Sequence, residues 1–300
     1  MSAGAVSRTI VAGWYYHDGM RLSVVVCCSN DFDLAHTLDS IDEDVEVVAS
    51  ITPNRMIEHY LRMRGVRYAI TPVGNHAVTT NSGIDLVQGD AVLIIDSDTV
   101  LLPGVIDKVR QRLATSPVVN VPIAFDAEDV KLSRLIARLR TFDNSYDAPA
   151  YKPGIAWRLD IRPSIGGYWY DPTVAWPCDA ELLGRLRRFG IPIDHLSQPG
   201  IVHRPISLRH ALRAYYHYGI GDSRRMALLG QDTHWWPLAN LAFRYRSALA
   251  ATRNDPALLA LLLVLDAMSL AGILGDIPTV RKLRKNRTRA VSASTGDSVR

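Results

Sequence analysis

Alternating strand and helix signals fill the first third of the chain, and they constrain its fold more than any other feature. Short apolar runs rich in β-branched residues predict buried strands, and each run is followed by a segment with a helix start and a helix stop. The predicted strands are 22–28, 45–51, 66–70 and 91–95, and the predicted helices are 34–40, 52–65, 79–88 and 103–113. Such repeated units with short connections imply an α/β fold, with a largely parallel sheet covered by helices.

Composition is compatible with this fold and restricts the class of protein and its cellular compartment. The 300 residues are 48% hydrophobic, enough for a sizeable core, and a net charge of +4 is too small for a general nucleic-acid binder. Cys27, Cys28 and Cys178 form neither a disulfide framework nor a zinc spacing. The N-terminal segment has no basic stretch leading into a long apolar run, so no signal peptide is predicted. We therefore expect a cytoplasmic protein.

The fourth predicted strand ends in two carboxylates. Val92–Leu101 reads VLIIDSDTVL, so Asp96 and Asp98 follow an apolar run at positions i and i+2 and lie on the same side of the backbone. In parallel sheets, ligands bind outside the carboxyl ends of the strands. Mg²⁺ and Mn²⁺ are usually held by one or two carboxylates together with substrate phosphates. The pattern predicts a metal and phosphate site, and the alternative is an ordinary solvated turn.

Other polar residues follow neighbouring predicted strands at the same edge. Asn30 comes after the first strand, and Ser50 and Thr52 end the second. Helix capping is the alternative role for Asn30 and Thr52. Residues 142–200 are irregular and aromatic, a composition that can stack on sugar rings or simply pack a loop-rich subdomain. Beyond residue 205 the pattern is helical, with breaks expected near 219–222, 235–237 and 254–256.

Three sequence blocks in a fixed order extend the argument. They are NSGIDLVQGDAVLIIDSDTVLLPG at 81–104, GGYWYD at 166–171 with CDAEL at 178–182 and RLR at 185–187, and VHR at 202–204. This order resembles the family 2 glycosyltransferases. In that family an Asn-x-Gly helix ends in Gly-Asp before the Asp-x-Asp strand, and a later acidic-Asp pair opens an Arg-rich helix. The resemblance covers about residues 22–204 and implies a GT-A fold, which is Rossmann-like with a mostly parallel sheet flanked by helices, here followed by a C-terminal helical extension.

The resemblance also implies an inverting transfer from a nucleoside-diphosphate sugar, linked to UDP, GDP or dTDP, with Mn²⁺ or Mg²⁺ as cofactor. Asp179 matches the catalytic base, with a helix N-cap as its structural alternative. Residues expected at the metal are Asp96, Asp98 and His203, with Asp98 the more direct ligand and a purely structural role as the alternative for His203. Residues expected at the donor are Asn30, Ser50, Thr52, Asn81, Asp96, Ser97 and Asp98. Residues expected at the acceptor, whose class the sequence does not identify, are Trp169, Asp171, Trp176 and Glu181.

Two departures from the family pattern leave rival functions open. The acidic residue that usually follows the second strand and contacts the nucleobase is missing from Ala49–Thr52, and Cys178 replaces the acidic residue that usually precedes the base. One rival is a haloacid-dehalogenase-like phosphatase, with Asp96 as nucleophile, Asp98 as acid/base and Gly221-Asp222-Ser223 as the later acidic motif. The other is a non-catalytic nucleotide- or glycan-binding protein of the same fold.

The expected organisation is a glycosyltransferase domain at 1–205, a helical extension at 206–280 and a basic, disordered tail at 281–300. The first domain divides into a nucleotide-sugar half at about 22–104 and an acceptor half at about 105–205. Ala257–Gly275 is nearly long enough to span a bilayer, but Asp266 at its centre favours a buried or membrane-surface helix. Together with the basic block after Arg281, this segment predicts peripheral contact with an anionic membrane. A homo-oligomer is a further possibility.

Overall fold

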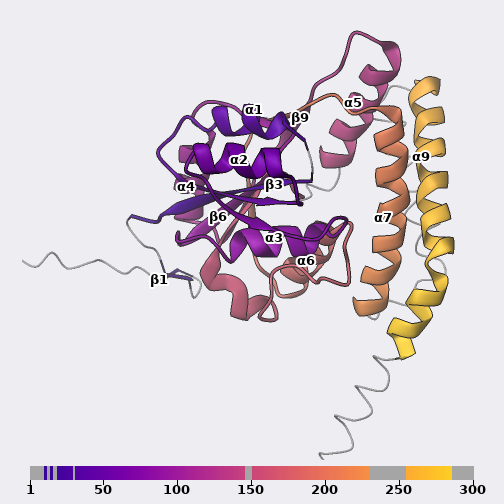
Figure 1. The fold of residues 1–300 in the computed structure, drawn as a ribbon. Coiled ribbons are helices and arrows are strands. Elements are labelled where there is room, and N and C mark those ends of the chain that lie inside the picture. Colours follow the sequence, from indigo (N-terminus) through magenta and orange to yellow (C-terminus); the bar gives the residue numbers. More distant parts are fainter. Residues whose placement is uncertain are drawn as a thin grey trace, which may run out of the picture.

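The computed structural model describes residues 10–11, 14–15, 19–29, 31–145, 151–229 and 255–285. Within these residues, helices cover both faces of a central sheet, and further helices stand beside it (Figure 1). Asn30, expected at the donor, lies outside the described residues, as do residues 235–237 and 286–300.

The central sheet has seven strands, in the order β11-β8-β10-β6-β3-β4-β5. They are β3 (Leu22–Cys28), β4 (Glu46–Ile51), β5 (Arg67–Ile70), β6 (Ala91–Asp96), β8 (Val118–Asn120), β10 (Ile155–Arg158) and β11 (Ile193–His195). Only β10 is antiparallel to its neighbours, and the other pairs are parallel. The predicted mostly parallel sheet is therefore confirmed, and β6 ends at its centre with Asp96.

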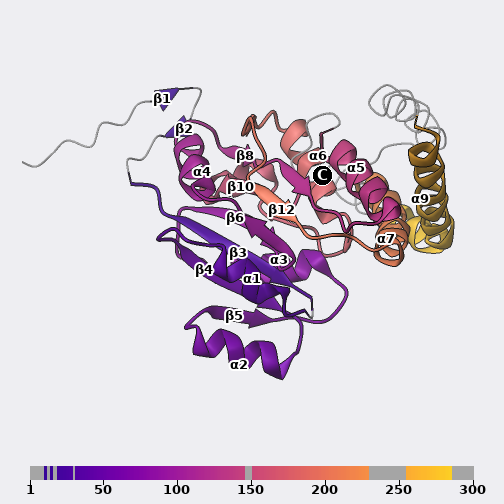
Figure 2. The ribbon, with the colours of Figure 1, turned by 90° about the horizontal axis from the view of Figure 1, so that it is seen from above.

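Successive residues of the strands feed two separate cores, as expected when side chains alternate across a pleated sheet. Val24 and Val26 pack with α1 (Asp33–Asp39), α2 (Arg55–Met63) and α4 (Val105–Leu113). Val25 and Cys27 pack on the other face with α3 (His76–Ile84), the 3₁₀ helix η1 (Leu159–Ile165) and α6 (Cys178–Arg188). Figure 2 shows the sheet from above, with the twist of its strands. Burial on both faces explains why these strands are continuously apolar.

A second, three-stranded sheet brings the end of the α/β region back to the aspartates. It consists of β7 (Thr99–Leu101), β12 (Ile201–His203) and β9 (Ile123–Phe125) in that order. His203 pairs with Thr99, and the backbone N–H of Arg204 donates to the carbonyl of Asp98 (3.0 Å). A short antiparallel pair, β1 (Ile10–Val11) and β2 (Trp14–Tyr15), lies near the N-terminus.

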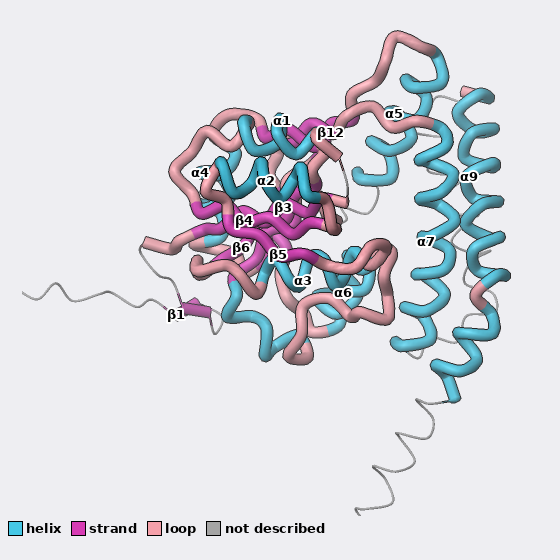
Figure 3. Tube along the Cα trace, in the orientation of Figure 1, coloured by secondary structure: helices cyan, strands magenta, loops and turns pink. Residues whose placement is uncertain are grey.

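Three helices pack on one another beside the sheet and form a separate core; Figure 3 shows where they stand. They are α5 (Lys131–Ser145), α7 (Leu208–Leu229) and α9 (Pro256–Gly275), and Ile136, Tyr215 and Leu262 are among the side chains buried between them. α7 and α9 can approach closely because residue 219 is glycine. A Cβ atom there would lie only 1.8 Å from the carbonyl oxygen of Ser269. The predicted helical extension is thus present.

Several helix boundaries differ from the prediction. α2 begins after Asn54, whose side chain accepts from the backbone of Met56 and Ile57, so Thr52-Pro53 does not start it. α3 begins at His76, since Asn75 accepts from the backbone of Val78. In both cases an asparagine close to the expected start is the better cap, because its side chain reaches the free N–H groups of the first turn.

Two other expectations about helices are wrong. α7 continues without a break through 219–222, since its glycines lie at close helix contacts. The first part of the expected tail, 281–285, continues a helical segment that starts at 277.

Candidate active site

Asp98 and His203 meet at the carboxyl end of the central strands. The Nε2 atom of His203 is 3.5 Å from Oδ2 of Asp98, although the two residues lie far apart in the sequence. The Nδ1 atom of His203 is 2.8 Å from the carbonyl oxygen of Arg204. A carbonyl oxygen can only accept, so Nδ1 donates to it, and Nε2 is the ring nitrogen that faces the Asp98 carboxylate and can bind a metal ion when it is deprotonated.

This pair fits a divalent cation. A histidine whose second nitrogen is fixed by a backbone carbonyl is the usual arrangement of a metal-ligating imidazole. No three His, Cys, Asp or Glu side chains among the described residues form a group able to hold a metal ion. The chain would therefore supply Asp98 and His203, leaving the remaining positions to phosphate oxygens and water, as is common for Mg²⁺ and Mn²⁺.

Asp96, the other carboxylate of the motif, faces a buried lysine that the sequence analysis missed. The Nζ atom of Lys152 lies 3.8 Å from Oδ1 of Asp96 and within 3.3–3.4 Å of Nδ1 of His76 and Oγ1 of Thr80. Burial by itself would lower the pKa of Lys152, but the surrounding acidic groups, with Asp96 the foremost, together outweigh it and raise that pKa. The ammonium group therefore stays charged and neutralises Asp96.

Asp31, also missed, lies on the other side of the aspartate turn. Its Oδ2 atom accepts a hydrogen bond from Ser97 Oγ (3.1 Å), whereas Oδ1 is buried without a partner in the described structure. Burial raises the pKa of Asp31, and the nearby charge of Asp98 adds to the effect. Its position directly after the first strand was a usable signal, but only the neighbouring Asn30 was predicted to lie at the site. α1 has Phe32 at its N-cap, with no side-chain cap.

Asp179 is held in place by two backbone N–H groups. Its Oδ1 accepts from Ala180 (2.9 Å), and its Oδ2 accepts from Lys152 (3.2 Å). The N-cap of α6 is Pro177, so the capping alternative for Asp179 is wrong. Burial raises the pKa of Asp179, while the Lys152 ammonium and the two backbone donors oppose that rise. Lys152 thus contacts Asp96 with its side chain and Asp179 with its backbone.

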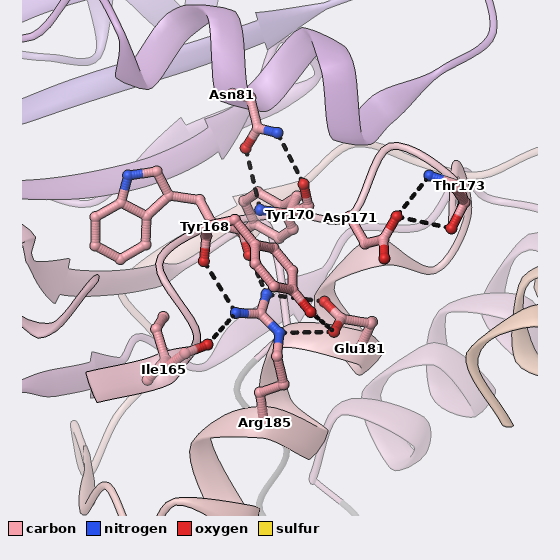
Figure 4. Close-up of polar contacts among 9 residues, drawn as sticks. Asn81, Ile165, Tyr168, Tyr170, Asp171, Thr173, Glu181 and Arg185 are labelled. Carbon is pink, nitrogen blue, oxygen red and sulfur yellow. Dashed lines mark hydrogen bonds and ion pairs between the residues drawn. The ribbon is translucent and has the colours of Figure 1, made fainter. Parts of the chain in front are cut away.

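The acceptor block around α6 is mostly an internal network (Figure 4). The Arg185 guanidinium binds both carboxylate oxygens of Glu181 (2.6 and 2.9 Å) and the backbone carbonyls of Ile165 and Tyr168. Glu181 is 2% exposed, and Trp169 is 4% exposed and packs on Trp157. This burial contradicts the predicted acceptor contacts of Trp169 and Glu181, which instead hold the segment together.

Asn81 and Asp171 also bind the chain itself. The Asn81 amide donates to the carbonyl of Tyr170 (2.8 Å) and accepts from its N–H (3.1 Å), which ties α3 to this segment (Figure 4). Asp171, partly exposed, accepts from the N–H and hydroxyl of Thr173. The side chain of Asn81 is therefore already occupied, and the Asp171 carboxylate stabilises a turn.

Trp176, the remaining acceptor candidate, lies between α3 and α7. Its ring is 4.1 Å from that of His76 and 5.7 Å from that of His217. α7 reaches this loop because residue 221 is glycine: a Cβ atom there would lie 1.1 Å from the carbonyl oxygen of Trp176. Partly exposed and flanked by histidines, Trp176 is better placed than Trp169 to meet a ligand.

Two donor candidates on β4 and after it have little exposure. Ser50 is fully buried beneath Gly83 of α3, and its hydroxyl has no partner among the described residues. Its predicted donor contact is contradicted, because the side chain points to the α3 face of the sheet. Thr52 and Ser97 are 5% and 4% exposed, so little of either side chain is open to a ligand.

The phosphatase alternative does not fit this arrangement. Its later acidic motif, Gly221-Asp222-Ser223, lies in the middle of α7. Asp222 forms an ion pair with Arg225 (3.2 Å), and Ser223 donates to the carbonyl of Ile220. None of these residues follows a strand of the sheet, where that motif would have to lie, so the resemblance to the motif is accidental.

Comparison with known proteins gives a likeness of fold only. No protein-family model matches this sequence, and no curated protein matches it. Among solved structures, a mycobacterial protein matches with a TM-score of 0.52 and 16% identity, covering 70% of this chain and 74% of that one. The chain has the GT-A fold.

Two other structures match more weakly. Residues 1–349 of TarS from S. aureus align over 90% of this chain and 92% of that one, with 12% identity and a TM-score of 0.49. Glucosyl-3-phosphoglycerate synthase from Mycobacterium tuberculosis, in complex with Mn²⁺, UDP and phosphoglyceric acid, aligns over 70% of this chain and 78% of that one, with 18% identity and a TM-score of 0.48.

Proposed function

We propose that this chain is an inverting, metal-dependent glycosyltransferase that moves a sugar from a nucleoside-diphosphate sugar to an acceptor hydroxyl. One observation carries the proposal: the Asp98–His203 pair lies at the carboxyl edge of a GT-A sheet, with Nε2 of His203 facing the Asp98 carboxylate. That arrangement suits a cation bound to a diphosphate.

Each residue then has a defined task. Asp98 and His203 hold Mn²⁺ or Mg²⁺, which when bound stabilises the negative charge on the departing diphosphate. Burial raises the pKa of Asp96, and the Lys152 ammonium opposes that rise and holds the carboxylate in position. The acceptor oxygen attacks the anomeric carbon as the bond from that carbon to the diphosphate oxygen breaks, which inverts the configuration. Asp179 takes the hydroxyl proton, and its raised pKa makes it a stronger base than an ordinary aspartate.

Thermal unfolding with a panel of nucleoside diphosphates and Mn²⁺ tests this proposal. The panel covers UDP, GDP and dTDP because the family's base-contacting acid is absent. A ligand present at 100 times its dissociation constant stabilises the fold by about 2.7 kcal/mol. We expect Asp98→Asn to abolish the Mn²⁺-dependent part of that stabilisation. Asp107→Asn, an exposed aspartate on α4, is the matched control.

Slow hydrolysis of the donor without an acceptor separates the enzyme from a non-catalytic binding protein of the same fold. We expect metal-dependent release of the nucleoside diphosphate by the wild type and none by Asp98→Asn. If a nucleoside diphosphate binds but none of the corresponding nucleotide sugars is hydrolysed, the result would instead favour the non-catalytic binding protein.

We also propose that the enzyme works in the cytoplasm at an anionic membrane surface. α9 is the one described helix that is long and apolar enough to cross a bilayer. Its inner face packs on α7, and Asp266 is buried, whereas Leu263, Leu270 and Leu274 are each more than half exposed. Residues 277–285 continue beyond it with Arg281, Lys282, Arg284 and Lys285. An apolar face next to a basic segment suits a helix lying on anionic lipid.

Vesicle flotation tests this placement. We expect the wild type to bind vesicles containing phosphatidylserine and to leave vesicles of phosphatidylcholine alone. Leu270→Glu should release it, and Leu102→Glu, an exposed leucine outside the helical extension, should not. Concentration-dependent dimerisation lost in Leu270→Glu, without vesicle binding, would show that this face pairs with a second copy of the chain.

A further inference from the structure

The first half of α7 carries basic side chains that the proposed mechanism does not use. His210, Arg213 and His217 lie at i, i+3 and i+7, on one face of the helix. His210 and Arg213 are exposed, and His217 is partly exposed. We refer to these three residues as the α7 basic row.

Arg213 has no hydrogen bond or ion pair with any described residue. The second half of the same helix differs: Arg224 pairs with Asp276 (2.7 Å) and Arg225 with Asp222 (3.2 Å). The second half thus uses its arginines to hold the fold together. Within the described part of the chain, nothing engages the exposed guanidinium of Arg213, which can therefore bind a ligand.

Side-chain contacts connect the α7 basic row to the candidate active site. His217 lies 5.7 Å from the Trp176 ring, and Trp176 lies 4.1 Å from the ring of His76. Nδ1 of His76 is 3.3 Å from the Lys152 ammonium, which lies 3.8 Å from Asp96. A continuous line of side chains therefore runs from the aspartate motif to α7.

The two ends of the row face different parts of the site. His210 is the end near the metal pair, because it lies in the first turn of α7, seven residues after His203. His217 is the end beside Trp176, directly before α6 and Asp179. Seven residues of helix separate the ends by about 10.5 Å. A group bound by Arg213 and His217 would therefore lie toward Trp176 and the start of α6, away from the Asp98–His203 end of the row.

From this placement, we infer that the acceptor carries a phosphate or carboxylate group, which Arg213 and His217 bind while Asp179 takes the proton from its hydroxyl. Arginine presents paired N–H donors that match the oxygens of both anions, and histidine adds a further donor. The Trp176 ring provides an apolar surface next to these donors. This inference rests on the proposed function and names the chemical class of its second substrate.

Inorganic phosphate, titrated into the full-length protein by calorimetry, is the probe. The measurement is made with Mg²⁺ alone and again with Mg²⁺ and saturating UDP. We expect the wild type to bind phosphate in both conditions. Arg213→Gln and His217→Gln should each weaken phosphate binding by about tenfold or more, because charge-assisted hydrogen bonds are lost. Arg213→Lys, which keeps the charge, should retain part of the affinity.

A matched control removes the same charge elsewhere. Arg62→Gln, on the exposed side of α2, should bind phosphate as the wild type does. All variants should keep the wild-type unfolding midpoint, because the α7 basic row lies at the surface. UDP affinity should also stay unchanged in Arg213→Gln.

Three results would overturn the inference: no phosphate binding by the wild type, equal phosphate affinity in the wild type and Arg213→Gln, or loss of phosphate binding when UDP is present. The last would mean that the row binds the donor's diphosphate. If UDP and the other nucleotides fail to bind while Arg213 still determines phosphate affinity, the anion site stands and the proposed glycosyltransferase function fails.

Discussion

The edge of the sheet around β6 and the segment around α6 use their polar residues in opposite ways. At the sheet edge, Asp98 and His203 face each other across 3.5 Å with no other side chain between them in the described structure. Around α6, the carboxylate of Glu181 and the amide of Asn81 are fully engaged with the chain itself. A polar side chain directly after a buried strand can be left open to a ligand. A polar side chain in an irregular segment often binds backbone N–H and carbonyl groups that have no partner in a helix or sheet.

Asp179 is the residue of the α6 segment that should behave like the sheet edge. In Asp179→Asn we expect the transfer rate to fall by about 10²–10⁴-fold, the usual contribution of a positioned general base. Donor affinity, measured by calorimetry with Mn²⁺, should change little, because the proposed base acts on the acceptor and the amide oxygen can still accept from one of the two backbone N–H groups. Asp171→Asn, in the same segment, is the control. Wild-type transfer by Asp179→Asn would put Asp179 among the purely structural residues.

Arg185 should show the opposite behaviour. Arg185→Met leaves the buried Glu181 carboxylate without its partner, so the free energy of unfolding should fall by about 3–5 kcal/mol. Urea denaturation measures this change. The double variant Arg185→Met with Glu181→Leu should regain much of the loss, since a buried pair is often replaceable by apolar side chains. If Glu181→Leu alone raises acceptor KM without loss of stability, Glu181 belongs to the acceptor site after all.

Asn81 tests the boundary between the two regions. Asn81→Ala removes two hydrogen bonds to Tyr170 and should lower the free energy of unfolding by about 1–3 kcal/mol. Nucleoside diphosphate affinity, measured on the folded variant, should stay within about twofold of the wild type, as expected for a difference well under 1 kcal/mol. A tenfold loss of that affinity would restore the donor-binding role that the sequence motif predicts.

The smallest expected effect is a displaced pH profile. A general base works only when deprotonated, so transfer should fall as the pH drops through the pKa of Asp179. Burial raises that pKa, so the acidic limb should lie above the ordinary aspartate value of about 3.9. Initial rates from pH 4 to 8 measure the limb, and Asp171→Asn should leave it in place. An acidic limb at or below the ordinary aspartate value would mean that the group controlling the rate is not Asp179 with a raised pKa.

The sequence predicted best what depends on neighbouring residues. The strand Leu22–Cys28 has the bounds expected, because a strand buried on both faces is apolar at every position. The Asp96–Asp98 turn was found for the same reason. The meeting of Asp98 with His203 was expected only through a family resemblance, since no local pattern relates residues so distant along the chain. Lys152 was missed because a single lysine in an irregular loop has no signature, and its burial depends on partners in β6, α3 and α6.

The glycine at position 221 has a consequence for how this protein can be taken apart or recombined. Helix α7 touches the Trp176 carbonyl there with no room for even one methyl group. The C-terminal helices are therefore no interchangeable module: a chimera joining another protein's helices to this α/β body would need glycine at the same point of contact. At this contact, substitutions in α7 and in the loop around Trp176 are therefore coupled.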